Sequence, residues 1–374
     1  MSGINNILQK LNEIAHNPKA QMERYIADGR KIVGCLPYFC PEELVHAGGM
    51  TPFGLWGAEV RVSEAKKYWP AFICSILQTT LELGMRGEYD GLEAVMIPIL
   101  CDSLKGMTDN WRFGVRNVPV IPVAHAQNRK TPAGVDFTAS QYRKIRSRLE
   151  ELSGNGISDG DIAGSVAVFN DRRAVMRRFQ KAAGQHPGLV KPSLRNAVFK
   201  AGYFMDVGEH TEIVYELNRL LEQSPAAAWS DPKIVTSGII ADHSDLLKIM
   251  DDCGIAVVDD EVTHESLRYR TDVPVTSDPT VGLARQIGNV EGCPVLFDPG
   301  KNRGAMLVEL AKKSGADGVL LVQTKFCDPE EYDYVPIKAM LDRAGIRNLQ
   351  VEVDQQTRSL EQARTAIETF CETL

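Results

Sequence analysis

Three cysteines stand where the chain could supply ligands to a cofactor: Cys74, Cys101 and Cys327. Cys101 follows the apolar run 92–100 and Cys327 follows the run 318–326, and both runs are typical of buried strands. In open α/β sheets, ligands and cofactors bind in the loops just beyond the carboxyl ends of the strands. Thiolates at such positions can hold an iron–sulfur cluster. The sequence therefore predicts that thiols reach a cofactor site.

Local context supports this interpretation more than spacing does. The three cysteines are far apart in the chain, so no C-x-x-C motif is present, and a free cysteine is often only a small buried apolar residue. A helix is predicted directly after Cys101, with Asp102 or Ser103 as its cap, and another after Cys327, with Asp328 as its cap. We expect thiols at these helix starts to ionise more easily, because the positive end of the helix dipole lies beside them.

Cys74 is expected within the first turns of a helix that runs from about 71 to about 83, with its start facing the same crevice. Cys40 precedes Pro41 at another strand-to-helix turn and is the alternative ligand. The other cysteines are interpreted as structural; they are Cys35, Cys253, Cys293 and Cys371.

Longer stretches of the sequence resemble a known family. They are Ile32-Val-Gly-Cys-Leu-Pro-Tyr-Phe-Cys-Pro-Glu-Glu-Leu-Val-His-Ala-Gly-Gly-Met, Pro98-Ile-Leu-Cys-Asp-Ser-Leu, Ala124-His-Ala-Gln-Asn-Arg, Lys325-Phe-Cys-Asp-Pro-Glu-Glu-Tyr-Asp-Tyr and Val353-Asp-Gln-Gln-Thr-Arg. These segments resemble the β subunit of the 2-hydroxyacyl-CoA dehydratases, a family that includes subunits of benzoyl-CoA reductase. The resemblance runs from about residue 4 to the carboxyl terminus.

The resemblance implies a two-subunit enzyme of amino-acid fermentation. A cytoplasmic location is expected separately, because no secretory signal is visible and the cytoplasm keeps thiols reduced. This chain would pair with a related α subunit, and each subunit would carry an oxygen-sensitive 4Fe–4S cluster. By the matching motifs, the protein ligands here would be Cys74, Cys101 and Cys327. Three cysteines leave one iron without a protein thiolate, whereas electron-transfer clusters are usually held by four.

The reaction implied by the resemblance is the elimination of water from an (R)-2-hydroxyacyl-CoA to give the (E)-2-enoyl-CoA. The proton that must leave is β to the thioester and weakly acidic. One strongly reducing electron, added to the thioester carbonyl, gives a ketyl radical that expels the hydroxyl group and acidifies this proton. A separate ATP-hydrolysing iron–sulfur activator would inject the electron, and the cluster of this chain would serve as a relay or supporting centre.

The absence of nucleotide-binding motifs agrees with placing ATP hydrolysis on a separate protein. The segment Asp298-Pro-Gly-Lys-Asn-Arg-Gly lacks the Ser or Thr that follows the lysine of a phosphate-binding loop, so ATP chemistry is expected on another protein. No G-x-G-x-x-G follows a strand, which argues against a standard nicotinamide site. A bound flavin is possible but is not predicted.

No catalytic residue is assigned, because the resemblance places most of the substrate site on the α subunit. Glu42 and Glu43 open a helix and are read as partners of its dipole, although Glu43 could face the crevice. His46 is interpreted as a packing residue, with proton transfer as its alternative role. His125 follows the strand 118–123, and a hydrogen-bonding role is expected for it.

Two other segments have alternative interpretations. The turn 236–244 could hold a phosphate or pantetheine on its amides, but an ordinary turn capped by Asp242 or Ser244 is favoured. A group of arginines on one helix could attract CoA phosphates or the activator, but a solvated helix face is favoured. This group consists of Arg172, Arg173, Arg177 and Arg178.

The order of elements predicts an α/β fold of two doubly wound, largely parallel-sheet domains with the cluster in the cleft between them. The domains are expected at 1–135, which begins with an amphipathic helix, and at 229–374; a helical connection spans 136–228. The strands are expected at 31–36, 51–56, 92–100, 118–123, 233–240, 255–258, 295–297, 318–323 and 349–353.

Composition is consistent with such an enzyme. With 42 basic and 49 acidic residues the net charge is −7, so nucleic acid is not an expected partner. Apolar runs end well before the ~20 residues needed to cross a bilayer, and the amino terminus shows no secretory signal. A benzoyl-CoA-reductase-type subunit and a non-catalytic, metal-binding scaffold remain as alternative functions. The sequence does not name the acyl group or the ligand of the fourth iron.

Overall fold

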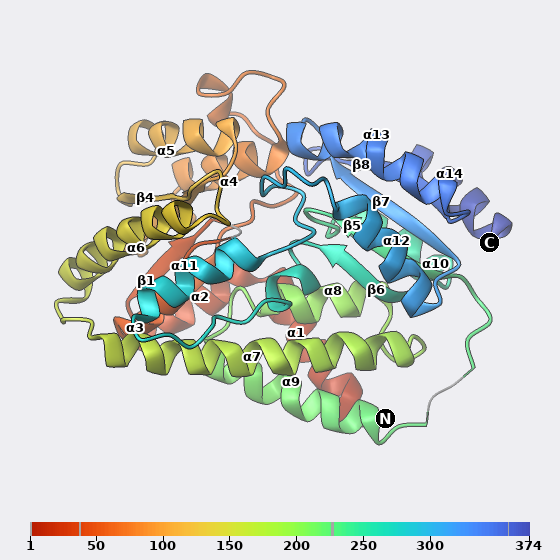
Figure 1. The fold of residues 1–374 in the computed structure, drawn as a ribbon, viewed down its shortest axis with the longest axis horizontal. Helices are drawn as coiled ribbons and strands as arrows, with labels where there is room; N and C mark the ends of the chain where they lie inside the picture. The colour runs from red at the N-terminus through yellow and green to blue at the C-terminus, as the bar shows by residue number, and fades with distance from the viewer. Residues whose placement is uncertain (1, 37–38, 226–227, 358) are drawn as a thin grey trace.

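The computed structural model describes residues 2–36, 39–225, 228–357 and 359–374. Two four-stranded parallel sheets stand side by side, and long helices run beneath and between them (Figure 1). Residues 226–227 of the expected connection before the second sheet, and residues 37–38 after the first strand, lie outside the described part of the chain. Within that part, no helix combines the length and the apolar character that a membrane span requires.

The first sheet has the spatial order β2-β1-β3-β4. Its strands are β1 (Ile32–Cys35), β2 (Thr51–Gly54), β3 (Ala94–Ile99) and β4 (Val120–Ala124). Successive side chains point to opposite faces, so Val95 and Ile97 join one apolar cluster while Ala94 and Met96 join another. Both faces are therefore buried, as expected for a parallel sheet.

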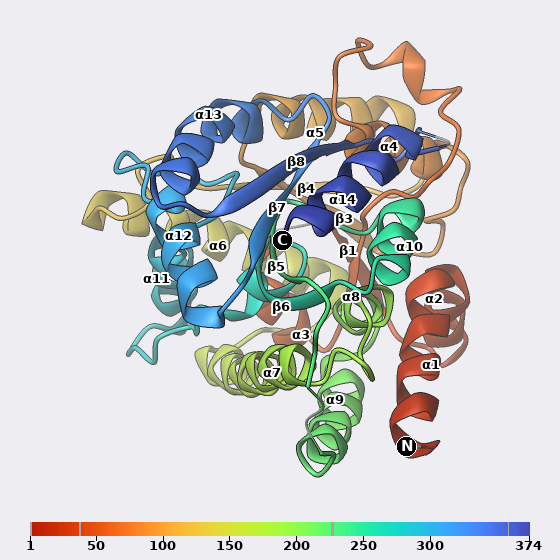
Figure 2. The same cartoon turned by 90° about the vertical axis from the view of Figure 1, so that its right-hand side faces the viewer.

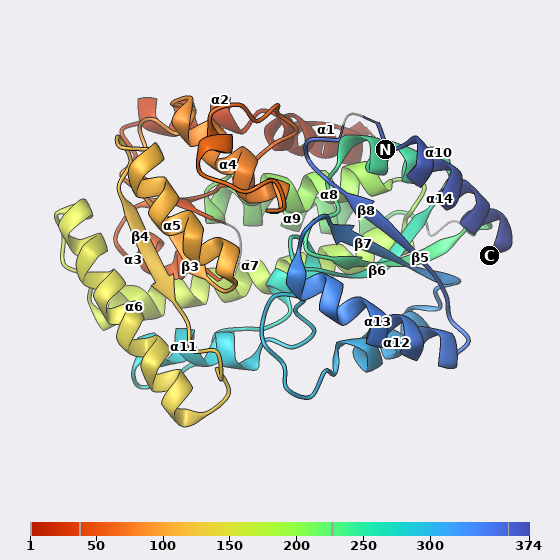
Figure 3. The same cartoon turned by 90° about the horizontal axis from the view of Figure 1, so that it is seen from above.

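The second sheet repeats this order as β6-β5-β7-β8. Its strands are β5 (Lys233–Gly238), β6 (Ala256–Val262), β7 (Gly318–Thr324) and β8 (Arg347–Val353). One face is covered by α10 (Ser244–Asp252) and α14 (Glu361–Thr373), and the other by α12 (Arg303–Ser314) and α13 (Asp328–Arg343) (Figures 2 and 3). Two doubly wound units are thus confirmed.

Helices dominate the middle of the chain, as predicted. They are α6 (Pro132–Ser153), α7 (Asp159–Gln185), α8 (Pro192–Ala201) and α9 (Val207–Glu222). The opening helix α1 (Ser2–His16) buries Ile4, Leu8 and Leu11 against this region, together with Phe179 of α7 and Leu217 of α9. The helix α2 (Pro18–Ala27) follows and leads to β1. The amphipathic opening helix therefore packs on the body of the same chain.

One helix from the carboxyl-terminal part of the chain packs with the first sheet. The helix α11 (Pro279–Asn289) contributes Leu283 and Ile287 to the apolar cluster that covers Val33 and Met96. It lies along α6 in Figure 1. The two units therefore share a core.

Two local predictions are wrong. The segment 295–297 is not a strand, because residues 290–298 form an irregular wall in which Cys293 and Leu296 pack against Val290. The helix after residue 71 begins later than predicted, since α4 spans Ser75–Met85. The remaining helices of the first unit are α3 (Glu42–Ala47) and α5 (Asp102–Gly114).

Aromatic rings join the two units where β2 and β6 end. His264, which is fully buried, stands edge-on to Trp56 with ring centroids 4.2 Å apart and stacks on Tyr203 at 5.0 Å. The guanidinium of Arg268 covers Tyr203 at 3.9 Å from the ring centroid. Neither ring nitrogen of His264 has a hydrogen-bond partner among the described residues, and burial lowers the pKa of His264 to about 3.

A buried ion network ties α8 to the end of β6. Arg195 of α8 is 2% exposed, and its two terminal nitrogens donate to Asp260 and Glu265. Asn196 donates to the other oxygen of Glu265 at 2.9 Å. Such a network contributes to stability only while every member is present.

We predict that Arg195→Met lowers the free energy of unfolding by about 3–5 kcal/mol, because it leaves two buried carboxylates without their cation. Urea denaturation followed by circular dichroism measures the change. The matched control is Arg219→Met, which breaks the exposed pair with Glu216 and should cost about 0–1 kcal/mol. A loss below about 1 kcal/mol for Arg195→Met would contradict the prediction.

His264→Phe should change how stability depends on pH. The native imidazole stays neutral down to about pH 3, whereas the unfolded one takes up a proton near pH 6.5. His264 therefore lowers the stability of the wild type as the pH falls below about 6.5, by about 1.4 kcal/mol per pH unit. The phenylalanine variant lacks this contribution. The free energies of unfolding, from urea denaturation at pH 7.5 and pH 5, measure this effect. Relative to the wild type, the variant should be more stable at pH 5 than at pH 7.5 by about 2 kcal/mol. An equal stability difference at both pH values would refute the prediction.

Candidate metal centre

The three cysteines predicted as ligands come together at the carboxyl ends of the two sheets. Each is the residue on which a helix begins: Cys74 precedes α4, Cys101 precedes α5 and Cys327 precedes α13. All three line one cavity of about 800 Å³ and belong to the same apolar cluster. Cys101 follows β3 of the first sheet and Cys327 follows β7 of the second. The cavity therefore lies between the units.

The three cysteines are themselves the N-cap residues of these helices, whereas the sequence predicted aspartate or serine caps for the helices after Cys101 and Cys327. Asp102 and Asp328 are the first helical residues, so neither is a cap, and Cys74 precedes its helix where a position inside it was predicted. The amide of Leu104 donates to Cys101 Sγ at 3.5 Å. The amides of Leu77 and Glu330 lower the pKa of Cys74 and Cys327, but neither sulfur forms a capping hydrogen bond. Cys101 is therefore the one of the three whose sulfur accepts a hydrogen bond from its helix in the described residues.

The expectation that these thiols ionise easily is wrong. Burial is the largest influence on all three, and it raises the pKa of Cys74 to about 12 in spite of the helix amides. The charges of Cys74 and Cys101 also raise the pKa of Cys327, which marks the three sulfurs as neighbours. A bound metal would reverse this balance, because coordination deprotonates a thiol outright.

The wall of the cavity carries a buried cation. Arg129 is 4% exposed and donates to the carbonyl oxygens of Phe297 at 3.1 Å and Val290 at 2.5 Å. Its charge also acts on Asp298, which lines the same cavity, and helps to lower the pKa of that carboxyl group. An iron–sulfur cluster held by three thiolates carries net negative charge, so a cation in the wall favours it.

The residues present fit a cluster better than a single ion. Among the described residues, no three His, Cys, Asp or Glu side chains are close enough to hold one metal ion. A four-iron cube holds its ligand sulfurs further apart, and its usual ligands are cysteines alone. The three thiols, the helix amides and the large cavity match those needs.

Sequence reasoning missed two wall residues. Cys293 lines the same cavity, and its sulfur accepts the amide of Val295 at 3.5 Å. Arg129 ends the family-like segment 124–129, and that resemblance was the only signal for it in the sequence. Cys40, the alternative ligand, does not line this cavity; its thiol donates to the carbonyl oxygens of Leu36 at 3.3 Å and Met96 at 3.5 Å.

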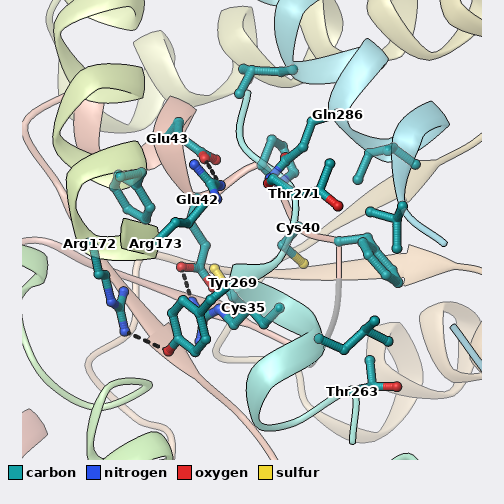
Figure 4. Close-up of a pocket in the computed structure, with 18 of the residues that line it drawn as sticks. Cys35, Cys40, Glu42, Glu43, Arg172, Arg173, Thr263, Tyr269, Thr271 and Gln286 are labelled. Atoms are coloured by element: carbon teal, nitrogen blue, oxygen red, sulfur yellow. Dashed lines mark hydrogen bonds and ion pairs between the residues drawn. The ribbon is translucent and has the colours of Figure 1, made fainter. Parts of the chain in front are cut away.

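A second, smaller cavity of about 70 Å³ lies beyond the carboxyl end of β1 (Figure 4). Glu43 lines it and pairs with Arg173, while Glu42 pairs with Arg268. Glu43 therefore faces this smaller cavity and not the crevice of the three cysteines, and its carboxylate is engaged by the guanidinium. Cys35 and Cys40 complete this part of the wall.

The arginine group is not a solvated helix face. Arg172 and Arg173 are 3% and 7% exposed, and Arg172 donates to Gly202 O and to the hydroxyl of Tyr269. Arg177 pairs with Asp272, and Arg178 pairs with Glu222. The prediction is wrong for the two buried arginines because α7 is covered on several sides by α3, α9 and α11.

The two histidines have the roles expected of them. His46 packs edge-on to Phe169 and shares a hydrogen bond of 3.0 Å with Ser165. His125 lines the large cavity and shares a hydrogen bond of 3.0 Å with the hydroxyl of Tyr142. Burial lowers the pKa of His125 to about 4, so at neutral pH it is uncharged.

Two amides of the turn 236–244 are engaged by carboxylates of the protein. His243 caps α10, accepting the amide of Asp245 at 3.2 Å, so neither Asp242 nor Ser244 is the cap. The amide of Ser244 donates to Glu59 at 2.7 Å, and the amide of Ile239 donates to Glu330 at 2.9 Å. The turn is thus held by protein carboxylates.

Known proteins resemble this chain over its full length. It is 45% identical to the (R)-phenyllactyl-CoA dehydratase beta subunit of Clostridium sporogenes and 38% identical to the lactoyl-CoA dehydratase subunit beta of Anaerotignum propionicum, with all of both chains covered in each case. It is 39% identical to the (R)-2-hydroxyglutaryl-CoA dehydratase, subunit beta, of Acidaminococcus fermentans, over 99% of this chain and all of that one. A benzoyl-CoA reductase subunit of Thauera aromatica is more distant, at 24% over 80% of this chain and 79% of that protein.

Residues 37–374 match the family model described as 2-hydroxyglutaryl-CoA dehydratase, D-component. The match includes all three cysteines of the cavity. The chain therefore belongs to the 2-hydroxyglutaryl-CoA dehydratase D-component family.

Proposed function

We propose that the chain is the β subunit of an (R)-2-hydroxyacyl-CoA dehydratase, a hydro-lyase that forms an (E)-2-enoyl-CoA. One observation carries the proposal: three cysteines, each at the start of a helix, surround a single cavity in a chain that aligns end to end with three dehydratase β subunits. The acyl group stays unassigned, because the three relatives are named for different substrates.

In this proposal Cys74, Cys101 and Cys327 hold a 4Fe–4S cluster. When bound, the cluster supplies a single electron of low potential, and an ATP-hydrolysing activator delivers that electron. The protein supplies the groups that surround the cluster. The amide of Leu104 donates to the sulfur of Cys101, Arg129 offsets negative charge, and the apolar cluster around Leu104 and Ile239 excludes water.

We propose the role of relay or supporting centre because the resemblance places most of the substrate site on the α subunit. Of the groups that line the cavity, His125 shares a hydrogen bond with Tyr142, and Asp298 accepts the amides of Gly300 and Asn302. Asp333 pairs with Lys301. We therefore place proton transfer on the α subunit, with a cytoplasmic location where thiols stay reduced.

The first test is iron and acid-labile sulfide in the complex with the α subunit, purified without oxygen. We expect about four of each in the β chain. Cys327→Ala should lose most of both from this chain, because two thiolates cannot retain the cluster. Cys40→Ala is the matched control and should retain them, since Cys40 lies outside the cavity. Absence of sulfide from the wild-type β chain would overturn the cluster assignment.

A second measurement separates the dehydratase from a reductase, which the more distant match to a benzoyl-CoA reductase subunit keeps as the alternative. A dehydratase recycles its electron, so many turnovers should follow each electron that the activator delivers. A reductase consumes electrons in proportion to product. Stoichiometric use of reductant would therefore contradict the proposed lyase activity.

A further inference from the structure

Glu330 joins the two central strands of the second sheet at their carboxyl ends. It lies in the first turn of α13, is 5% exposed, and uses both carboxylate oxygens. Oε1 accepts the amide of Ile239, just after β5, and Oε2 accepts the amide of Thr324, the last residue of β7, each at 2.9 Å. β5 and β7 are the neighbours between which the strand order reverses, where open α/β sheets usually bind a ligand. Here a side chain of the protein occupies that place.

The same residue is linked to Cys327 through one helical turn. The amide of Glu330 acts on the sulfur of Cys327, and the amide of Glu331 donates to the carbonyl oxygen of Cys327 at 3.0 Å. The turn from Cys327 to Glu330 is therefore a rigid unit, and the carboxylate fixes that unit to both strands. Phe326, beside the cysteine, has a φ of 61°, so the loop has little conformational freedom to reposition the sulfur alone.

The carboxylate of Glu330 also brings a negative charge close to Cys327. The cation that acts on Glu330 is Arg303, but it is engaged by Glu261 at 3.0 Å and by the hydroxyl of Ser237 at 2.9 Å. After burial, the charge of Glu330 is the largest influence that raises the pKa of Cys327. A negative charge close to a ligand sulfur disfavours reduction of an iron–sulfur cluster, because reduction adds a further negative charge.

We propose that Glu330 is a positioning residue for the cluster: it fixes Cys327 at the junction of β5 and β7 and places a negative charge beside the ligand sulfur, which lowers the potential of the cluster. This inference rests on the proposed function, since it takes Cys327 as a cluster ligand. Glu330 is not a catalytic residue, because its oxygens are held by the two strand amides.

The test compares Glu330→Gln with Glu331→Gln in the anaerobic αβ complex. Glu331 is the exposed neighbour in the same turn of α13, so its variant controls for loss of charge on this helix. Iron content and the midpoint potential of the β cluster, from an electron-paramagnetic-resonance redox titration, are measured at pH 8.5. The two backbone amides that donate to its carboxylate favour the ionised form of Glu330.

We expect Glu330→Gln to shift the midpoint to a less negative potential and to alter the signal of the reduced cluster, while Glu331→Gln matches the wild type. Glu330→Asp, which keeps the charge but cannot span both strands, should lose cluster iron with a smaller shift in potential. A Gln variant with wild-type iron content, potential and spectrum would overturn the inference. Failure of both Glu330 variants to fold would also overturn it, because Glu330 would then serve the fold alone. A wild-type β chain without sulfide would instead refute the proposed function.

Discussion

The site depends on one constraint of parallel sheets, which is that every strand ends at the same edge and every following helix begins there. This chain applies the constraint twice, with strand orders β2-β1-β3-β4 and β6-β5-β7-β8, and the helix starts of α4, α5 and α13 converge on one cavity. Residues distant in sequence become neighbours because the topology leaves their helices no other place to begin. The thiols are accordingly fixed by the two sheets, and each unit contributes at least one of the three cysteines to the cavity.

The usual ligand positions of the two sheets are filled by protein side chains. At the end of β1, the thiol of Cys40 donates to the carbonyl oxygens of Leu36 and Met96, and the pair Glu43–Arg173 borders the small cavity (Figure 4). At the end of β5, the carboxylate of Glu330 binds the amides of two strands. The open space that remains is the large cavity between the units. This distribution suits a chain that holds a cofactor and leaves the substrate to a partner.

The sequence was sufficient where local patterns decide the structure. The apolar runs 92–100 and 318–323 predicted the strands β3 and β7 to within two residues, and alternation with helices predicted both parallel sheets. The run 295–297 has the same composition but follows Pro294 and packs as an irregular wall, so three apolar residues were too few to decide. The three cysteines proposed as ligands were chosen through a family resemblance as well as their positions. Their spacing alone would not have separated them from Cys293, which reaches the same cavity.

Local sequence patterns do not identify side-chain partners that are distant in the sequence. Arg172 and Arg173 belong to a charged stretch that would face solvent on an isolated helix, yet α7 is enclosed and Arg173 pairs with Glu43 on α3. Glu330 similarly reads as a first-turn carboxylate that favours the helix dipole, whereas its real partners are the ends of β5 and β7.

Burial also raises the pKa of all three cavity thiols. The free thiols are therefore held protonated in an apolar pocket whose wall carries the buried cation Arg129. In the proposed function, binding of iron by the thiolates would offset the cost of burying both. Because Cys74 and Cys101 come from one unit and Cys327 from the other, a cluster bound by all three would also link the two units.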